Sequence, residues 1–328
     1  MRYVVVGTGS VGTLLAARLA SSGLLSAAVS RSMGTALQSF TIVSARGRES
    51  YEVPVVEEWS SIPDEPEQVA LLAVKSQDTI AALAAMRAAD RRLPVVCVQN
   101  GVDNERQALR VMPTVLGCLV LCPVRRTAPG IVHSYATPTY GVFNVGCWPA
   151  GDGGKVDSLA AEVAGDLTAA GLASRALPDI ATWKYAKLLS NILNALDALS
   201  GWSARSSWVA ELIGAEARRC FAAAGISAQT SEQLGEVAAG LADYAEVEGV
   251  PFTGSSTMQS LERHEGSVEV DYLNGEIALL GRLHGVPTPA NDLVQRRCWA
   301  AATAQEAPGG VDPDELLRAL GETGALGT

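Results

Sequence analysis

RYVVVGTGSVGTLLAARLASSG, residues 2–23, is the stretch that decides the fold. Residues 2–6 form a short run rich in β-branched side chains, which is typical of a buried strand. Residues 7–12 then read G-x-G-x-x-G, and residues 11–22 have a helical pattern that Gly23 ends. A glycine motif that follows a strand and opens a helix predicts a dinucleotide-binding turn, whereas the alternative is a glycine-rich turn without a ligand.

Each glycine of this motif has its own physical task. Gly7 allows a tight turn, Gly9 lets the backbone approach a pyrophosphate, and Gly12 lets helix and strand pack closely. The N-terminus of the helix supplies N–H donors and the positive end of its dipole to phosphates. We therefore predict that the cofactor is bound by Gly7, Thr8, Gly9, Ser10, Val11 and Gly12.

The end of the second strand, residues 25–30, bears on the choice of cofactor. NAD-binding proteins usually place Asp or Glu there, about 20 residues past the glycines, to hold the ribose 2′-hydroxyl. Here Arg31 stands between Ser30 and Ser32, with no acid. An arginine flanked by hydroxyls suits a 2′-phosphate, which favours NADP. The alternative is a solvated surface arginine.

The rest of the chain divides into two halves by pattern. Strands are expected at 69–74, 93–98, 115–121 and 131–135, with a helix over 77–89. Alternating strands and helices predict parallel βαβ units. After Pro178 we expect one long helix over 179–200, further helices to about 246, and another helix over 268–284. The predicted class is α/β: a Rossmann-type doubly wound sheet in an NADP-binding domain (1–177) and an all-helical substrate domain (178–328).

Polar residues follow two of the expected strands and one expected helix. Lys75 and Asn100 come just after strands, where ligands bind in open parallel sheets, although Asn100 could instead cap a turn. Lys187, Asn191 and Asn194 have spacings of four and three, so on one helix they share a face. Such a face among apolar residues suits a polar cleft, unless the three are exposed or have structural partners.

Three further residues are ambiguous by pattern alone. Ser255 and Ser256 end a glycine-rich loop, and Glu269 lies in the first turn of the expected helix over 268–284. Favourable electrostatics at a helix start would account for Glu269, and an ordinary loop hydroxyl for Ser256.

Composition excludes several classes of function. The net charge of −10 argues against nucleic acid as a partner. The six cysteines form no CxxC pair and the three histidines lack metal-ligand spacing, so we expect reduced thiols and no metal. With no membrane span and no secretory signal in the pattern, a soluble, cytoplasmic protein is expected. Only the tail from about residue 307, rich in Gly, Pro and acid, suggests disorder.

Taken together, these motifs resemble the ketopantoate reductase (2-dehydropantoate 2-reductase) family, a group within the 6-phosphogluconate-dehydrogenase-like two-domain oxidoreductases. The Lys-x3-Asn helix followed by E-x-D-Y-x-N-G is the most specific part of the resemblance. The matching segments are GTGSVG (7–12), Arg31, AVKSQDT (73–79), QNGVDNE (99–105), APG-x-V-H (128–133), WKYAKLLSNILNAL (183–196), GSS (254–256) and EVDYLNGE (269–276).

The resemblance implies NADPH-dependent reduction of a 2-oxo acid of the ketopantoate type, as in pantothenate biosynthesis. Lys187 would be the general acid, Glu269 would contact substrate and cofactor, and Lys75 would contact the cofactor. Asn100 would touch both nicotinamide and substrate. The substrate would also meet Asn191, Asn194, Ser255 and Ser256.

This chain also departs from the family pattern. The family's second helix asparagine often lies four residues after the first, whereas Asn194 is three after Asn191, a rotation of about 100° on a helix. The substrate could therefore be another small ketone or an imine. A non-catalytic NADP sensor is the alternative of another class, and a homodimer is possible.

Overall fold

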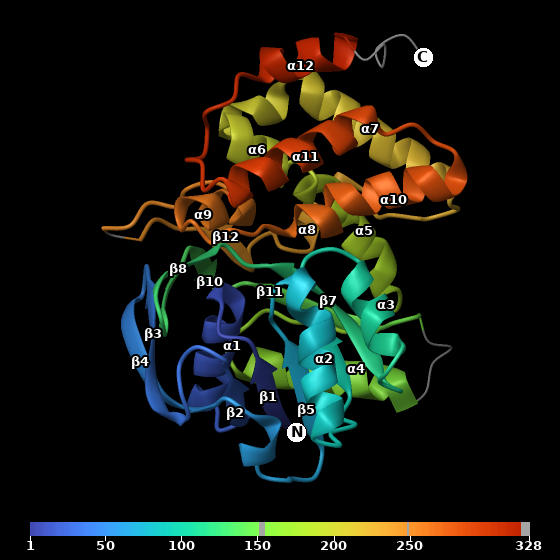
Figure 1. The fold of residues 1–328 in the computed structure, drawn as a ribbon. Coiled ribbons are helices and arrows are strands. Elements are labelled where there is room, and N and C mark those ends of the chain that lie inside the picture. Colours follow the sequence, from blue (N-terminus) through green and yellow to red (C-terminus); the bar gives the residue numbers. More distant parts are fainter. Residues whose placement is uncertain (151–154, 248, 323–328) are drawn as a thin grey trace. The chain divides into compact units, whose positions relative to one another are not determined.

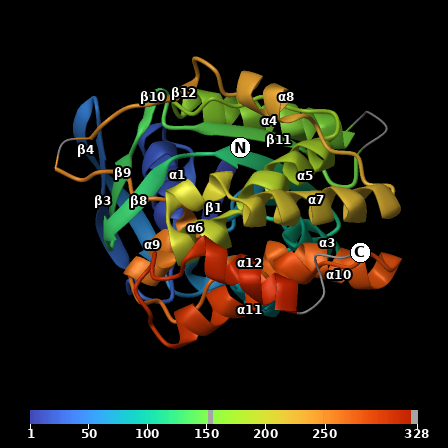
Figure 2. The ribbon, with the colours of Figure 1, turned by 90° about the horizontal axis from the view of Figure 1, so that it is seen from above.

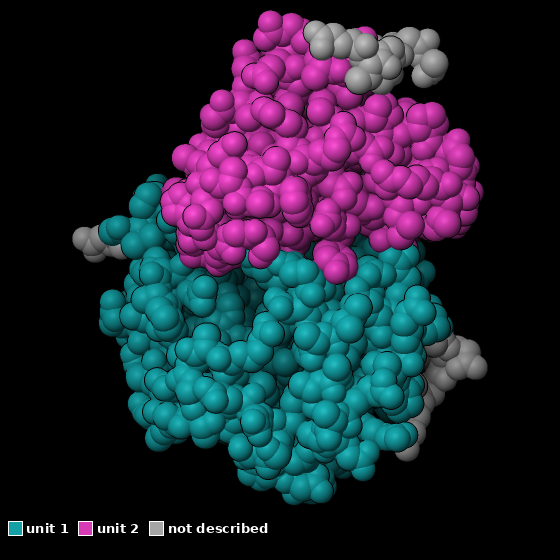
Figure 3. Space-filling view, in the orientation of Figure 1, with its two compact units in different colours: residues 1–184, 230–252 teal, residues 185–229, 253–328 magenta. Residues whose placement is uncertain are grey.

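The computed structural model describes residues 1–150, 155–247 and 249–322, and it divides into two compact units. The first comprises Met1–Lys184 and Thr230–Phe252 (teal in Figure 3). The second comprises Tyr185–Gln229 and the described residues from Thr253 onward. The chain thus passes between the units three times, whereas the sequence suggested one boundary near residue 178.

A ten-stranded, mostly parallel sheet forms the centre of the first unit (Figure 1). Its strands are β1 (Arg2–Val6), β2 (Leu25–Val29), β3 (Ala36–Ser44), β4 (Gly47–Val56), β5 (Gln68–Leu72), β6 (Val95–Cys97), β7 (Val115–Leu121), β8 (Val124–Ala128), β9 (Ile131–Ser134) and β11 (Val142–Cys147). Their order is β11-β7-β6-β5-β1-β2-β4-β3-β9-β8. From β4 through β2, β1, β5 and β6 to β7 every neighbouring pair is parallel, as in a Rossmann-type sheet.

Helices cover both faces of this sheet, and β1 shows why. Tyr3 and Val5 belong to the core that includes α1 (Ser10–Ser21) and α4 (Lys155–Ala169). Val4 and Val6 belong to the opposite core, with α2 (Thr79–Ala88) and α3 (Asp103–Leu109). Successive side chains of a strand point to opposite faces, so an apolar run fills both layers. The predicted α/β class with a doubly wound sheet is confirmed.

The β3–β4 hairpin was missed by the sequence prediction, which placed no strand over residues 36–56. Its two strands pair antiparallel from Ala36–Val55 to Ser44–Gly47, and Gly47 has a φ of 111° at the turn. The early residues of both strands are largely exposed, so polar side chains interrupt the apolar pattern. A weak alternation of this kind is the reason why the hairpin escaped a search for apolar runs.

The second unit is helical and is seen from above in Figure 2. Its elements are the later part of α5 (Ile180–Asn191), α6 (Asn194–Ser200), η3 (Trp202–Ser206), α7 (Trp208–Ala223), α9 (Ser256–Glu262), η4 (Glu269–Tyr272), α10 (Asn274–His284), α11 (Pro289–Thr303) and α12 (Pro313–Glu322). The helix α12 lies within the tail whose composition suggested disorder, so residues 313–322 of that tail are helical. Residues 323–328 of that tail lie outside the described residues.

The single helix predicted over 179–200 is wrong, because α5 ends at Asn191 and α6 begins at Asn194. The buried side chain of Asn274 donates from Nδ2 to Ile192 O at 2.9 Å. This carbonyl lies in the break, and its partner comes from a segment 82 residues away. Local pattern does not contain that information.

The expectation of helices up to residue 246 is also wrong. After α8 (Ser231–Glu236), β12 (Ala242–Tyr244) pairs antiparallel with β10 (Ala136–Pro138) of the first unit. Leu234 and Val237 pack with Leu119 and Ile180 in a small apolar cluster. The segment that the pattern assigned to the helical half therefore belongs to the sheet-containing unit.

Candidate functional site

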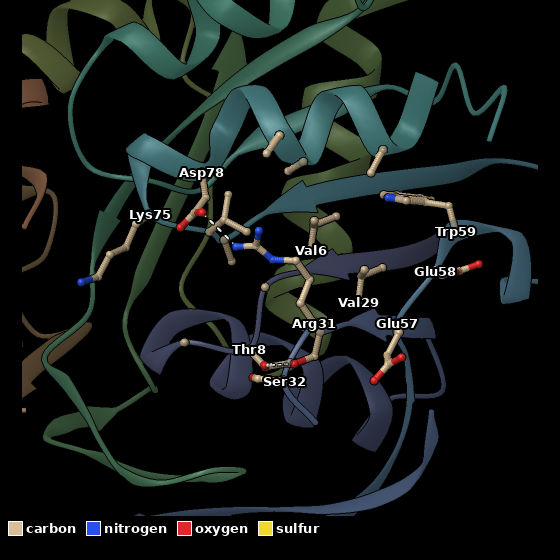
Figure 4. A pocket seen from close by; sticks show the side chains of 18 of the residues that line it. Val6, Thr8, Val29, Arg31, Ser32, Glu57, Glu58, Trp59, Lys75 and Asp78 are labelled. Atoms are coloured by element: carbon tan, nitrogen blue, oxygen red, sulfur yellow. Dashed lines mark hydrogen bonds and ion pairs between the residues drawn. The ribbon is translucent and has the colours of Figure 1, made fainter. Parts of the chain in front are cut away.

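A cleft of about 710 Å³ opens at the carboxyl ends of β1, β2 and β5, within the first unit (Figure 4). Ligands bind at this edge of open parallel sheets. Its lining comes from the glycine turn, the ends of β2 and β4, the β5–α2 loop, the alanine-rich side of α2, and β8. The lining residues are Val6, Gly7, Thr8, Gly9, Val29, Ser30, Arg31, Ser32, Glu57, Glu58, Trp59, Ser60, Ala73, Val74, Lys75, Asp78, Ala81, Ala82, Ala85, Ala88, Ala89 and Arg126.

The glycine turn has the geometry that the motif predicts. Gly7 has a φ of +102°, a backbone angle that residues with a side chain rarely adopt. A Cβ on Gly12 would lie 1.9 Å from Gly7 O, so helix and turn need glycine there to pack. A Cβ on Gly9 would meet nothing within 4 Å, although Gly9 lines the cleft. The protein itself therefore leaves the space beside Gly9 open to a ligand.

The first turn of α1, which adjoins this glycine turn, contributes no negative charge of its own. Its N-cap, Gly9, offers no side chain, and its first turn contains no acid. Ser10 Oγ accepts a hydrogen bond from Arg126 N at 3.1 Å, which ties β8 to the start of the helix. Arg126 also lines the cleft. A helix N-terminus beside an arginine is a suitable environment for a phosphate group.

Arg31 follows β2 as predicted, and its guanidinium has a partner across the cleft. Arg31 Nη2 lies 2.9 Å from Asp78 Oδ1, and Figure 4 shows the side chain extending toward that carboxylate. The two flanking hydroxyls differ in availability. Ser30 is 4% exposed and its Oγ lies 2.7 Å from Thr8 Oγ1, whereas Ser32 is exposed. Of the two serines, only Ser32 therefore has an exposed hydroxyl.

Trp59 is a cleft residue that the sequence analysis missed. It is 3% exposed, and its indole Nε1 has no hydrogen-bond partner among the described residues. Figure 4 shows the ring at the side of the cleft near α2. A buried indole N–H ordinarily has an acceptor, so this donor fits a ligand that supplies one. The only local signal was an aromatic residue soon after an unrecognised strand.

A buried hydrogen-bond network joins the two loops that carry Lys75 and Asn100. Asn104 Nδ2 donates to Asn100 O at 2.9 Å and to Ser76 Oγ at 3.2 Å. Thr79 Oγ1 donates to Asn104 Oδ1 at 2.8 Å and accepts from Gln99 Nε2 at 2.7 Å. Asn104 therefore holds one predicted cofactor loop through the backbone carbonyl of Asn100 and the other through the side chains of Ser76 and Thr79. Its sequence position did not indicate this role.

Lys184, which precedes the predicted catalytic lysine by three positions, belongs to the same network. Its Nζ donates to Gln99 O at 3.1 Å and to Glu105 Oε1. The two side chains are 3% and 0% exposed. Burial raises the pKa of Glu105 and outweighs the opposing effect of Lys184. This pair holds the carbonyl that directly precedes Asn100.

Lys187 and Asn191 lie four residues apart on α5, so they share a helix face as predicted. Both side chains are partly exposed. The Oδ1 atom of Asn191 is buried and has no hydrogen-bond partner among the described residues. An acceptor in this state fits a ligand that donates a hydrogen bond to it.

Asn194 has a different environment, because it begins α6 rather than continuing α5. It is 5% exposed, and its Oδ1 accepts from Arg205 Nη2 at 2.7 Å. Its backbone carbonyl accepts from Ser255 Oγ at 3.2 Å. Ser255 N in turn donates to Asp197 Oδ2 at 2.7 Å. Asn194 and Ser255 are thus structural partners, while Ser256, at the start of α9, is exposed.

Glu269 is not in the first turn of a long helix, and that prediction is wrong. It begins the separate 3-10 turn η4, and α10 starts five residues later at Asn274. The favourable helix-start electrostatics that offered a structural explanation for Glu269 therefore belong to other residues of α10.

Neither a metal centre nor a membrane span is found in the described part of the chain. Residues 1–150, 155–247 and 249–322 contain no group of three or more His, Cys, Asp or Glu side chains able to hold a metal ion. Within the same residues, no helix has the length and apolar character needed to cross a bilayer.

Comparison with known proteins shows which family this chain resembles. The family model described as Ketopantoate reductase PanE/ApbA matches residues 3–150, and that described as its C-terminal part matches residues 179–298. The 2-dehydropantoate 2-reductase of Pyrococcus horikoshii is 23% identical, over 94% of this chain and 99% of that protein. The enzyme of the same name from Aquifex aeolicus is 26% identical, over 90% of this chain and 95% of that protein.

Solved structures share the fold. A PanE/ApbA family ketopantoate reductase from Ralstonia eutropha JMP134 superposes with a TM-score of 0.75 at 24% identity, covering 93% of this chain and 99% of that one. D-mandelate dehydrogenase, in a ternary structure with NADH and anilino(oxo)acetate, gives a TM-score of 0.76 at 19% identity, with coverage of 93% and 99%.

Proposed function

We propose that this chain, which belongs to the ketopantoate reductase family of oxidoreductases, reduces a 2-oxo acid to the 2-hydroxy acid with NADPH, ketopantoate being the first substrate to test. Family membership supports the reaction class, and the cleft at the strand ends supports the cofactor class. The open space at Gly9 is the observation that carries the proposal, because it is shaped for a close approach by a ligand's phosphates.

The residues present in the cleft fit a nicotinamide dinucleotide. The N-terminus of α1 and Arg126 would hold the pyrophosphate. The indole N–H of Trp59, which has no acceptor among the residues that the structure describes, would meet one at the adenosine end. Arg31 would pair with a 2′-phosphate by charge-assisted hydrogen bonds. Lys75 and Asn100 would line the nicotinamide side, their loops fixed by Asn104.

A bound nicotinamide cofactor supplies the hydride that such a reduction needs. The protein must then deliver a proton to the carbonyl oxygen. We assign this to protonated Lys187, whose Nζ acts as general acid. Asn191, whose Oδ1 has no hydrogen-bond partner within the described ranges, would orient the substrate, and Ser256 and Glu269 would contribute further contacts. A non-catalytic sensor of NADP would need residues that bind the cofactor but no proton donor. The presence of Lys187 therefore favours a catalyst.

NADPH oxidation followed at 340 nm, with ketopantoate and an NADH control, tests the proposal. Turnover that falls by orders of magnitude in Lys187→Ala, with NADPH binding retained, is the expected result. A variant that keeps full turnover would contradict the role of Lys187. Arg126→Ala should weaken NADPH and NADH alike, since both contain the pyrophosphate; a selective effect would contradict its assignment.

A different small ketone, such as another 2-oxo acid, or an imine is the second candidate substrate. Asn194, at the position expected to reach the substrate, already bonds Arg205. A panel that adds aromatic 2-oxo acids and imines tests this idea, and a preference of several orders of magnitude for one of them would establish it. The possible homodimer stays a prediction, for sedimentation to measure.

A further inference from the structure

We propose that Asp78 is the residue that limits how strongly this site prefers NADPH to NADH. In this role its carboxylate holds Arg31 when no phosphate is present, competes with the 2′-phosphate of NADPH for that guanidinium, and accepts a hydrogen bond from the 2′-hydroxyl of NADH. The inference rests on the dinucleotide binding proposed above and adds a residue that sets its selectivity.

The carboxylate of Asp78 faces the cleft and does not cap the helix that Asp78 begins. It is the N-cap of α2, where an aspartate ordinarily accepts a hydrogen bond from the first helical turn. Here the side chain makes no capping hydrogen bond, and it lies 2.9 Å from Arg31 Nη2 instead. Arg31 and Asp78 both line the cleft. Their ion pair therefore lies where the adenosine ribose of a bound dinucleotide would come within reach of both side chains.

The ion pair is exposed enough to open. The Arg31 side chain is 74% exposed and that of Asp78 is 37% exposed. Ion pairs in such surroundings are weak, because water screens them and long side chains lose freedom when they pair. Arg31 can therefore exchange one anionic partner for another.

The anions that compete for Arg31 are unequal. A phosphate monoester carries about −1.5 to −2 charges near neutral pH, so it outcompetes one carboxylate, yet the displaced carboxylate stays nearby and repels it. The 2′-hydroxyl of NADH, by contrast, is attracted to Asp78, because a hydroxyl donates a hydrogen bond to a carboxylate. Acids in NAD-binding sites hold the 2′-hydroxyl in this way, usually from the end of the second strand. Asp78 offers the same chemistry from across the cleft.

Of the other charged residues that line the cleft, Glu57, Glu58 and Lys75 do not replace Asp78 as the partner of Arg31. Glu57 and Glu58 also line it, but Figure 4 shows both carboxylates turned away from the Arg31 guanidinium. Lys75, three residues before Asp78, extends to the far side in the same view. The contest for Arg31 is thus between Asp78 and the ligand.

Dissociation constants for NADPH and NADH, measured by titration calorimetry at fixed ionic strength, test the inference. Asp78→Asn keeps the size of the side chain and removes its charge. We expect the affinity ratio of NADPH to NADH to rise about tenfold, as relief of a like-charge contact near a surface predicts. The ratio of adenosine 2′,5′-bisphosphate to AMP should rise in parallel, without any substrate or turnover.

Glu57→Gln is the matched control, because it removes a charge from the same cleft without touching the ion pair; its ratio should stay near that of the wild type. If both dinucleotides bind and Asp78→Asn leaves the ratio unchanged, the inference is wrong and the proposed function stands. If neither dinucleotide binds wild-type protein at millimolar concentration, the proposed function and the inference fail together.

Discussion

Lys184 Nζ and Glu105 Oε1 form an ion pair in which neither side chain is more than 3% exposed. The same ammonium group donates to Gln99 O, next to the predicted nicotinamide-side residue Asn100. Ion pairs without water need further hydrogen bonds to offset the loss of hydration. Glu105 Oε2 nevertheless has no hydrogen-bond partner among the described residues. The pair therefore serves to hold a loop in place more than to stabilise the fold.

Lys184→Met should destabilise the protein by about 3–5 kcal/mol, because it leaves the Glu105 carboxylate buried without its cation. Urea denaturation followed by circular dichroism measures this loss. The double variant Lys184→Met/Glu105→Leu should recover most of it, since an apolar pair of similar volume needs no counter-charge. If the double variant is less stable than either single variant, the pair contributes net stability and our interpretation is incorrect.

Much of this region was predictable, and the network was not. The strand, glycine motif and helix at the start of the chain predicted the Rossmann-type sheet. Arg31, Lys75 and Asn100 were predicted as binding residues because each follows a strand, and ligands bind at the carboxyl ends of parallel strands. Lys184, Glu105 and Asn104 looked like ordinary helix residues. Their roles depend on partners up to 85 residues away, as in the bond from Lys184 to Gln99, and local pattern does not encode such contacts.

Trp59→Phe should weaken binding of both dinucleotides about five- to tenfold, because it removes the indole donor and keeps an aromatic ring. The melting temperature should fall modestly, because Trp59 is 3% exposed and the smaller ring leaves part of its site unfilled, although the indole N–H has no partner to lose among the described residues. Titration calorimetry measures the affinities. Trp299→Phe is the control, as Trp299 is 54% exposed on α11 and does not line the cleft. Equal affinities in wild type and Trp59→Phe would show that the indole N–H makes no ligand contact.

His133 should make the first unit less stable in acid. Burial lowers the pKa of His133 below its ordinary value of 6.5, and Arg48 and Arg125 act in the same direction. The folded state thus binds this proton less readily than the unfolded state. The associated stability is present above pH 6.5 and is lost as the pH falls from there through the lower folded-state pKa.

His133→Gln should remove that part of the pH dependence. Urea midpoints at half-unit steps from pH 8 to pH 5 measure it, and the wild-type curve should fall more steeply below pH 6.5 than the variant curve. Parallel curves for wild type and His133→Gln would rule out this source of acid sensitivity.

The two asparagines after Lys187 illustrate what a helical pattern leaves undecided. Spacing alone placed Asn191 and Asn194 on one face of one helix. The break between α5 and α6 separates them, and it accompanies a bond from Asn274, a residue 82 positions further on. As a result the buried Oδ1 of Asn191 has no hydrogen-bond partner in the described part of the chain, whereas the same atom of Asn194 bonds Arg205.

Alanine substitution should therefore separate a substrate contact from a structural one. Asn194→Ala removes the acceptor that lies 2.7 Å from Arg205 Nη2 and should cost about 1–3 kcal/mol of stability, with KM little changed in protein that remains folded. Asn191→Ala loses no acceptor bond among the described residues and should raise KM for the 2-oxo acid or lower kcat, with stability nearly unchanged. Steady-state kinetics and urea midpoints on the same samples test both. If Asn194→Ala instead raises KM at unchanged stability, Asn194 contacts substrate, and its bond to Arg205 must open when substrate binds.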